Sequence, residues 1–307
     1  MFRWFGILRD LTKFPISLLA ALSAGAGFIL VREGGADGVA GTALGVLLLS
    51  CGSCALNQYQ ERETDGRMER TRGRPLPAGK MAPSLAFFTA SALILLGSLV
   101  LFLAAGGTVC ALGLFAAGWY NGLYLYLKRK TTWAVLPGAL IGAIPPAMGW
   151  MAGGGRLGDP RLMAVCLFLF LWQVPHFWLL LLERSGDYER AGLPSLAQRL
   201  TAEQLKRVTF SWILCTAASS LLIPLFLVVN FPLTLFLLLA ATLWLLWRAA
   251  GFFRSSRSGR EMRYAFLRLN LYVWGVLLLL SLDRCLHFNL PAGGLIGRIF
   301  FMGLGSV

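Results

Sequence analysis

Long apolar runs, repeated along nearly the whole chain, are the feature that most constrains its fold. A helix needs about 20 apolar residues to cross the roughly 30 Å hydrocarbon layer of a bilayer, and several of the runs are long enough. With 57% hydrophobic residues, a soluble domain of 307 residues could not bury this much apolar surface. We therefore predict a single all-α polytopic membrane domain, residues 1–307, in which nine transmembrane helices form a bundle around a central cavity. The nine runs lie at about 14–31, 38–57, 83–105, 107–127, 133–152, 162–182, 208–229, 231–249 and 268–286.

The net charge of +14 would by itself be compatible with nucleic-acid binding, but its distribution argues against that class of partner. With a cytoplasmic amino terminus, the segments between the nine runs place 23 of the 28 Lys and Arg residues inside and 5 outside. Such a bias orients membrane proteins. The sequence therefore predicts a multi-pass protein of the inner, cytoplasmic membrane, with its amino terminus in the cytoplasm and its carboxyl terminus outside. It predicts the lipid bilayer as a partner and no nucleic acid.

A dense charged segment follows the second apolar run. Between Asn57 and Arg74 the chain carries four acidic residues and five arginines. Asn57, Glu61 and Asp65 are spaced by four residues, so on a helix they share one face and drift by only about 40°. Amide and carboxylate oxygens suit Mg²⁺, and arginines suit phosphate. The alternative is a solvated loop whose acids balance its arginines; the regular spacing favours a magnesium–diphosphate site, with Arg62, Arg70 and Arg74 as phosphate ligands.

Two further sets of polar residues lie near the same predicted side. The loops at 58–82 and 183–207 hold eight of the fourteen acids, and we expect them to face each other across the cavity. Lys128 and Arg129 end the fourth run. There they either help to orient the helices in the membrane or reach the diphosphate. His176 lies within the sixth run, and an ionisable side chain there is either functional or hydrogen-bonded between helices.

Four ordered motifs resemble the UbiA-type intramembrane prenyltransferases and, within them, the protoheme IX farnesyltransferase (heme O synthase) subfamily. The resemblance covers residues 10–195 well and the last third by hydrophobicity alone. Lys13 stands in a Lys-Phe-Pro sequence where the subfamily commonly has Lys-Pro-Arg, so one expected basic residue is absent. The motifs are Leu11-Thr12-Lys13; Asn57-x3-Glu61-Arg62-x2-Asp65 with Arg70-Thr71-x2-Arg74-Pro75-Leu76; Lys128-Arg129 leading to Pro145-Pro146-x2-Gly149-Trp150; and Trp172-x2-Pro175-His176-Phe177 followed by Asp187-Tyr188.

The resemblance implies both the reaction and further site residues. It implies transfer of a farnesyl group from farnesyl diphosphate to a vinyl group of heme B, with addition of water, giving heme O and diphosphate. It implies a second Mg²⁺ site at Glu183 and Asp187, whose alternative is a solvated helix end, and heme contact at Trp172 and His176. Heme A synthase or the assembly of a terminal oxidase would then be the candidate protein partners. On this basis the catalytic set is Asn57, Glu61, Asp65 and Asp187.

Two other functions remain open at this point. A related prenyltransferase would use an aromatic quinone precursor or a chlorophyllide as acceptor. A transporter or channel would place acidic residues near the middle of the bilayer. The acids here gather at the cytoplasmic ends of the apolar runs, which favours an enzyme.

Overall fold

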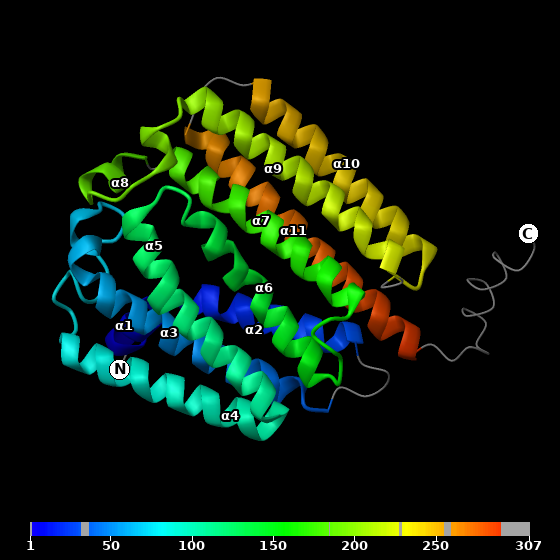
Figure 1. Ribbon diagram of the computed structural model, residues 1–307, viewed down its shortest axis with the longest axis horizontal. Coiled ribbons are helices and arrows are strands. Elements are labelled where there is room, and N and C mark those ends of the chain that lie inside the picture. Colours follow the sequence, from blue (N-terminus) through cyan, green and yellow to red (C-terminus); the bar gives the residue numbers. More distant parts are fainter. Residues whose placement is uncertain (1, 32–36, 184, 227–228, 255–258, 290–307) are drawn as a thin grey trace, which may run out of the picture.

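The described part of the chain is built from helices. The computed structural model describes residues 2–31, 37–183, 185–226, 229–254 and 259–289, and these contain no strand. The all-α prediction is confirmed. The elements, shown in Figure 1, are α1 Phe2–Leu11, α2 Phe14–Val31, α3 Val39–Arg67, α4 Pro83–Gly118, the π-helix η1 Trp119–Tyr124, α5 Leu125–Lys130, α6 Val135–Ala152, α7 Pro160–Glu183, α8 Ser185–Arg190, the 3-10 turn η2 Leu196–Gln198, α9 Ala202–Leu222, the 3-10 turn η3 Ile223–Phe226, α10 Pro232–Arg254 and α11 Gly259–Asn289.

The predicted count of nine membrane spans is not confirmed. Eight helices within the described ranges are long and apolar enough to cross a membrane. The difference arises in 83–130, which holds two of the predicted runs in one continuous helical stretch. Gly106 interrupts this stretch with φ 86° and ψ 171°, values that only glycine adopts readily. The chain reverses direction inside α4 (Figure 1), so the two predicted runs form two arms of α4, and the count of eight treats 83–130 as a single candidate span.

The join before α10 is a connection between two helices rather than a kink in one. The Asp283 carboxylate on α11 accepts hydrogen bonds from the backbone N–H groups of Asn230 and Phe231 and from the Asn230 side-chain amide. α10 then begins at Pro232, whose missing N–H is no loss at a helix start. A buried carboxylate thus fixes the entry of α10; residues 227–228 lie outside the described ranges.

The helices α2 and α6 pack closely against each other in the core of the bundle. α2 crosses α6 where a side chain on Gly27 would overlap the backbone of Pro146 and one on Gly149 would overlap the carbonyl of Ala24. Small residues let transmembrane helices approach in this way. Trp150, also on α6, is 1% exposed, so this crossing is part of the core.

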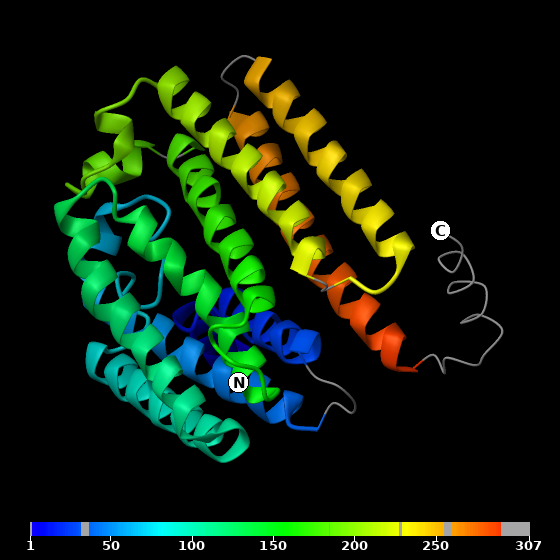
Figure 2. The ribbon, with the colours of Figure 1, turned by 45° about the vertical axis from the view of Figure 1, so that its right-hand side comes forward.

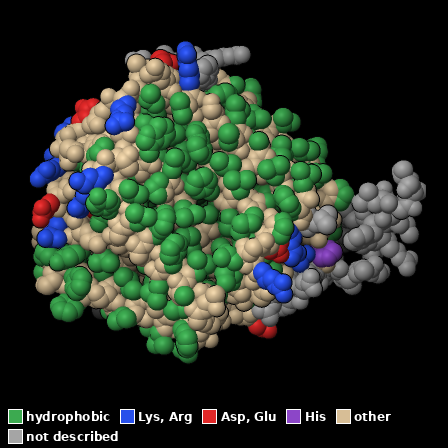
Figure 3. All heavy atoms as spheres, in the orientation of Figure 1, with side chains coloured by type: hydrophobic (Ala, Val, Ile, Leu, Met, Phe, Trp, Pro, Cys, Tyr) green, Lys and Arg blue, Asp and Glu red, His purple; other side chains and the backbone are tan. Residues whose placement is uncertain are grey.

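The helices form two groups, which the turned view separates. α9, α10 and α11 lie side by side next to α7, and α2, α3, α4 and α6 form the other part (Figures 1 and 2). Apolar side chains cover the middle of the face in Figure 3, while charged side chains gather near its ends. This apolar belt fits a bundle that is surrounded by lipid.

Candidate active site

The predicted polar face lies on the last turns of α3. Its three residues, Asn57, Glu61 and Asp65, are called the stripe below. Asn57, Glu61 and Asp65 are 1%, 5% and 4% exposed, although α3 ends at Arg67, close to the end of the bundle. Since residues four apart share one face of a helix, the three polar groups lie on the inward side of α3. Buried carboxylates require partners, because an isolated buried charge is strongly unfavourable.

Each residue of the stripe has a cationic partner from a different element. The Lys128 amine lies 2.6 Å from Oε1 of Glu61. Nη1 of Arg74 lies 2.7 Å from Oδ2 of Asp65, and the Lys13 amine donates a hydrogen bond of 2.8 Å to Oδ1 of Asn57. Three cations therefore surround two carboxylates, which leaves an excess of positive charge suited to an anionic ligand.

Lys13 is a site residue that the sequence motif did not reveal as such. It connects α1 to α2 with φ 46°, the one positive φ among the described residues other than glycine. Its amine also donates to the Tyr120 hydroxyl at 3.3 Å, and that hydroxyl donates to Oδ1 of Asn57 at 3.1 Å. Burial lowers the pKa of the Lys13 amine, and the neighbouring Arg74 guanidinium pushes it further in the same direction.

A compact turn after α3 brings Arg74 back to the stripe. The Thr71 hydroxyl donates to the backbone carbonyl of Asp65 at 2.8 Å. The backbone N–H of Arg74 donates to the carbonyl of Thr71 at 3.0 Å. Thr71 is fully buried, so the turn is held on both sides and its arginine points back toward Asp65.

The wider helical turn η1 lies on the path to Lys128. It carries Tyr120 and Asn121, and the Asn121 amide donates to the Ser53 hydroxyl of α3 at 2.7 Å. Tyr120 and Tyr124 stack with ring centroids 5.8 Å apart. π-helical turns often mark functional sites; here the segment aligns a tyrosine and, two turns later, a lysine with α3.

Three other predicted phosphate ligands have different surroundings. The Arg62 guanidinium lies over the Tyr59 ring, 4.8 Å from its centroid, and donates to the Tyr59 carbonyl. Arg129 donates to the backbone carbonyl of Gln60 at 3.3 Å. Arg70 is exposed in the turn that follows α3. The structure thus brings Arg74 and Lys128 to the acids of the stripe and holds Arg62 and Arg129 on neighbouring backbone.

The second acidic segment contacts the first directly; that the two face each other across a central cavity stays a prediction. Oδ1 of Asp187 accepts hydrogen bonds from the backbone N–H of Glu69 at 3.0 Å and from Arg190 at 2.7 Å. Burial would raise the pKa of Asp187, but these hydrogen bonds outweigh it and hold the pKa below its ordinary value. Glu183 is the last residue of α7, one turn before Asp187.

Apolar contacts reinforce this junction between the two loops. Met68, Ala191 and Leu193 form a small buried cluster on which Tyr188 packs. The ends of α3 and α7 are therefore held at one end of the bundle, where Figure 1 shows α8 beside the end of α3.

Trp172 and His176 lie one turn apart on α7, facing α11. Their rings meet edge to face with centroids 5.2 Å apart. Nδ1 of His176 lies 2.8 Å from Oδ1 of Asn270, a partner that the sequence analysis did not identify. Trp172 is 8% exposed.

The donor set of the stripe fits a magnesium ion. The described residues hold no group of three or more His, Cys, Asp or Glu side chains placed to bind a metal together. Mg²⁺ does not need one, since it usually binds one or two carboxylates and completes its shell with water and substrate phosphate. Two buried carboxylates and one amide oxygen on a single helix face match that requirement.

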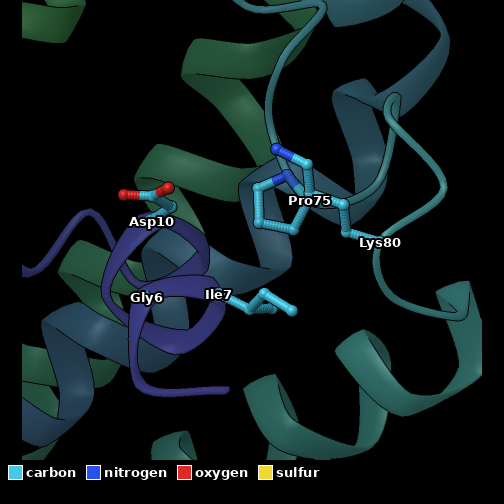
Figure 4. Close-up of a pocket in the computed structure, with 5 residues that line it drawn as sticks. All are labelled: Gly6, Ile7, Asp10, Pro75 and Lys80. Carbon is cyan, nitrogen blue, oxygen red and sulfur yellow. The ribbon is translucent and has the colours of Figure 1, made fainter. Parts of the chain in front are cut away.

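A small cavity of about 240 Å³ lies away from the stripe. Gly6, Ile7, Asp10, Pro75 and Lys80 line it, between α1 and the turn after α3 (Figure 4). It is not the predicted central cavity, which stays a prediction.

Comparison with known proteins gives a consistent family. The sequence profile described as the UbiA prenyltransferase family matches residues 14–274. A Geobacter sulfurreducens protein named protoheme IX farnesyltransferase is 43% identical over 224 residues, which cover 71% of this chain and 81% of that protein. A protein of the same name from Oleidesulfovibrio alaskensis is 38% identical, with 60% of this chain and 66% of that protein covered.

Solved structures share the fold at low identity. A digeranylgeranylglyceryl phosphate synthase has a TM-score of 0.73 at 15% identity, covering 94% of this chain and 100% of that one. A UbiA homolog from Archaeoglobus fulgidus, bound to GPP and Mg²⁺, has a TM-score of 0.63 at 15% identity, covering 90% and 99%.

Proposed function

Because the chain belongs to the UbiA prenyltransferase family, we propose that it transfers a farnesyl group from farnesyl diphosphate to a vinyl group of heme B. Water adds in the same reaction, and the products are heme O and diphosphate. The observation that carries the proposal is the buried stripe Asn57, Glu61 and Asp65 with its three cations. The acceptor is inferred from the relatives described above, which are named protoheme IX farnesyltransferases.

Mg²⁺ would be held by Asn57, Glu61 and Asp65, with Asp187 and Glu183 on the facing loop as a second set. When bound, the ion supplies positive charge to the departing diphosphate. Arg74, Lys128 and Lys13 lie where they can shift from the stripe to phosphate oxygens, and they would stabilise the negative charge that builds as the carbon–oxygen bond breaks.

In the proposed reaction, the apolar interior keeps water away from the reacting carbon. Breaking the allylic carbon–oxygen bond leaves positive charge on carbon, which water would capture too early in an open site. Trp172 and the His176 ring would contact the porphyrin and orient the vinyl group toward that carbon. The product would pass to heme A synthase or to the assembly of a terminal oxidase.

The proposal includes an orientation in the membrane. The stripe would face the cytoplasm, where both substrates arrive, with the amino terminus inside and the carboxyl terminus outside. The surplus of Lys and Arg in segments on the stripe's side supports this orientation. Arg32 and Arg298, two of the five cations counted as outside, lie beyond the described residues.

The test is conversion of heme B by purified protein in lipid nanodiscs supplied with farnesyl diphosphate and Mg²⁺. Hemes are extracted, and heme O is identified by mass. Glu61→Gln and Asp65→Asn should each lower conversion by about 100- to 1000-fold, and EDTA should stop it until Mg²⁺ is restored. Glu63→Gln is the matched control, since the Glu63 side chain is 81% exposed on the same helix.

Two results would contradict the proposal. If both stripe variants convert heme B at the wild-type rate, the stripe is not the metal site. If an aromatic quinone precursor is prenylated while heme B is not, the acceptor assignment is wrong.

A further inference from the structure

The hydrogen bond between α7 and α11 determines which nitrogen of His176 carries the hydrogen. Nδ2 of Asn270 donates to the backbone carbonyl of Phe266 at 2.7 Å, so the amide oxygen is the end that faces His176. An amide oxygen only accepts hydrogen bonds, and Nδ1 lies 2.8 Å from it. Nδ1 must therefore donate, and the neutral ring keeps its lone pair on Nε2.

The His176 ring lies among aromatic side chains, one of which carries an unpartnered donor. The rings of Phe266, Trp172 and Phe177 lie 4.7, 5.2 and 5.4 Å from the His176 ring, centroid to centroid. Within the described part of the chain, Nε2 has no hydrogen-bond partner. The buried Nε1–H of Trp172, one turn away, has none either. One water that accepts from the indole and donates to the imidazole would satisfy both.

We propose that His176 is the base for the water addition and that Asn270 is the positioning residue that keeps it in the competent tautomer. This inference rests on the proposed farnesyl transfer to heme. It assigns a residue to the one chemical step for which the acidic stripe offers none, because the carboxylates of the stripe are already paired with cations.

The addition forms one carbon–carbon bond and one carbon–oxygen bond. The vinyl double bond supplies an electron pair that joins its terminal carbon to C1 of the farnesyl group, as diphosphate leaves with the electrons of the carbon–oxygen bond. The inner vinyl carbon is then cationic, and the oxygen of water bonds to it. One proton of that water passes to Nε2 of His176, leaving a hydroxyl group on the product. The protonated oxygen is strongly acidic at this stage, so a neutral imidazole is a sufficient acceptor.

The position of His176 along its helix fits the stripe. His176 lies seven residues before the end of α7, a rise of about 10 Å, and Glu61 lies six residues before the end of α3, about 9 Å. The contact of Asp187, on α8, with the backbone of Glu69 ties together the segments that follow these two helices. His176 and Glu61 therefore lie at similar depths on separate helices.

A histidine that only ligates heme iron would use the same lone pair. A lone pair bound to iron cannot accept a proton, so the two roles exclude each other during turnover. They also leave different chemical traces. Loss of an iron ligand changes the heme spectrum, whereas loss of the base changes the product. Without His176 to accept a proton from the adding water, the cation loses a proton from the neighbouring carbon to the released diphosphate. The product is then a farnesylated heme lighter by one water.

The first experiment reads the tautomer directly in heme-free protein. The chain has two histidines, so protein labelled with ¹⁵N-histidine gives two imidazoles, and His287→Gln assigns the spectrum. We expect the Nδ1–H tautomer for His176 in the wild type and in Asn270→Asp, which keeps an acceptor. Asn270→Leu should lose it. Tyr272→Phe is the matched control, because it removes buried hydrogen bonds to Ser220 and Thr242 from the same helix.

The second experiment analyses the products. His176→Gln should lower the ratio of hydrated to dehydrated farnesyl heme by about 100-fold, and Asn270→Leu by about 10- to 100-fold. Asn270→Asp should shift the ratio less than Asn270→Leu, and Tyr272→Phe should leave it at the wild-type value. Diphosphate release should persist in His176→Gln, which separates this step from the metal site.

Each contrary result has a distinct meaning. An Nε2–H tautomer in the wild type, or a normal hydrated product from His176→Gln, overturns the inference. So does a His176→Gln variant that loses the heme-binding spectrum while its residual product stays hydrated, since that outcome indicates iron ligation. If wild-type protein farnesylates no heme yet shows the Nδ1–H tautomer, the proposed function fails while the structural part of the inference holds.

Discussion

Replacing Glu61 and Lys128, singly and together, separates the ion pair's contribution to stability from the role of Glu61 in catalysis. The two side chains are 7% and 22% exposed and their charged atoms lie 2.6 Å apart. Glu61→Gln leaves the Lys128 charge without its partner, and Lys128→Met leaves the Glu61 carboxylate without its own. The double variant removes both charges at once.

The magnitude follows from burial. Breaking a buried ion pair by removing one partner costs about 3–5 kcal/mol, whereas replacing both partners by neutral groups is often close to neutral. Lys128 is the more exposed partner, so water screens it better when it is left alone. We therefore expect a loss near 3 kcal/mol for Glu61→Gln and near 5 kcal/mol for Lys128→Met. The double variant should recover most of either loss, while farnesyl transfer stays reduced about 100- to 1000-fold in both proteins that lack Glu61.

The assay pairs denaturant unfolding in detergent with the heme-extraction assay on the same preparations. Additive losses of stability in the double variant would refute the pairing, because residues in direct contact should couple. Recovery of farnesyl transfer in the double variant would refute the catalytic role and leave Glu61 as a partner for Lys128 alone.

Three further outcomes follow from the same structure. Lys13→Met removes a cation from Asn57 and should raise the KM for farnesyl diphosphate about tenfold or more in steady-state kinetics; an unchanged KM would exclude the amine from the phosphate site. Gly149→Ala places a methyl group on the backbone of α2 and should destabilise the protein by about 1–3 kcal/mol in denaturant unfolding, whereas Gly118→Ala, which meets open space, should not. The stabilising contribution of Asp187, whose folded pKa lies below its ordinary 3.8, should be complete at neutral pH and fade as the pH falls from about 4 through the lower folded value; proteolysis of the 183–207 loop that does not accelerate over this window would contradict it.

Sequence pattern predicted most of the helices because each crossing has its own apolar run. The break at Gly106 also falls between two of the predicted runs, 83–105 and 107–127. What the pattern could not predict is how the two arms of α4 pack against α3 and α6. The anchoring of α10 by Asp283 was equally hidden, since it joins residues more than 50 positions apart.

The candidate site also has a part that local sequence spacing predicts and a part that depends on long-range packing. The spacing of Asn57, Glu61 and Asp65 is local and follows from helix geometry alone, so it could be predicted. Their partners could not, because Lys13 lies 44 residues from Asn57 and Lys128 lies 67 residues from Glu61. Such pairs depend on how helices pack, which periodicity does not determine.

The tie between the two acidic loops bears on how the two halves of the reaction are arranged. Asp187 and the buried cluster of Met68, Ala191 and Leu193 hold the segment after α3 against α8 and the turn that follows it. In the proposed reaction, α3 then carries the residues that would hold Mg²⁺ for the departing diphosphate, and α7 carries the base that acts last. A base beside the stripe would be protonated less readily, because three cations already surround it. Placing His176 on a separate helix, paired with the neutral Asn270, keeps its lone pair away from that positive charge until the water adds.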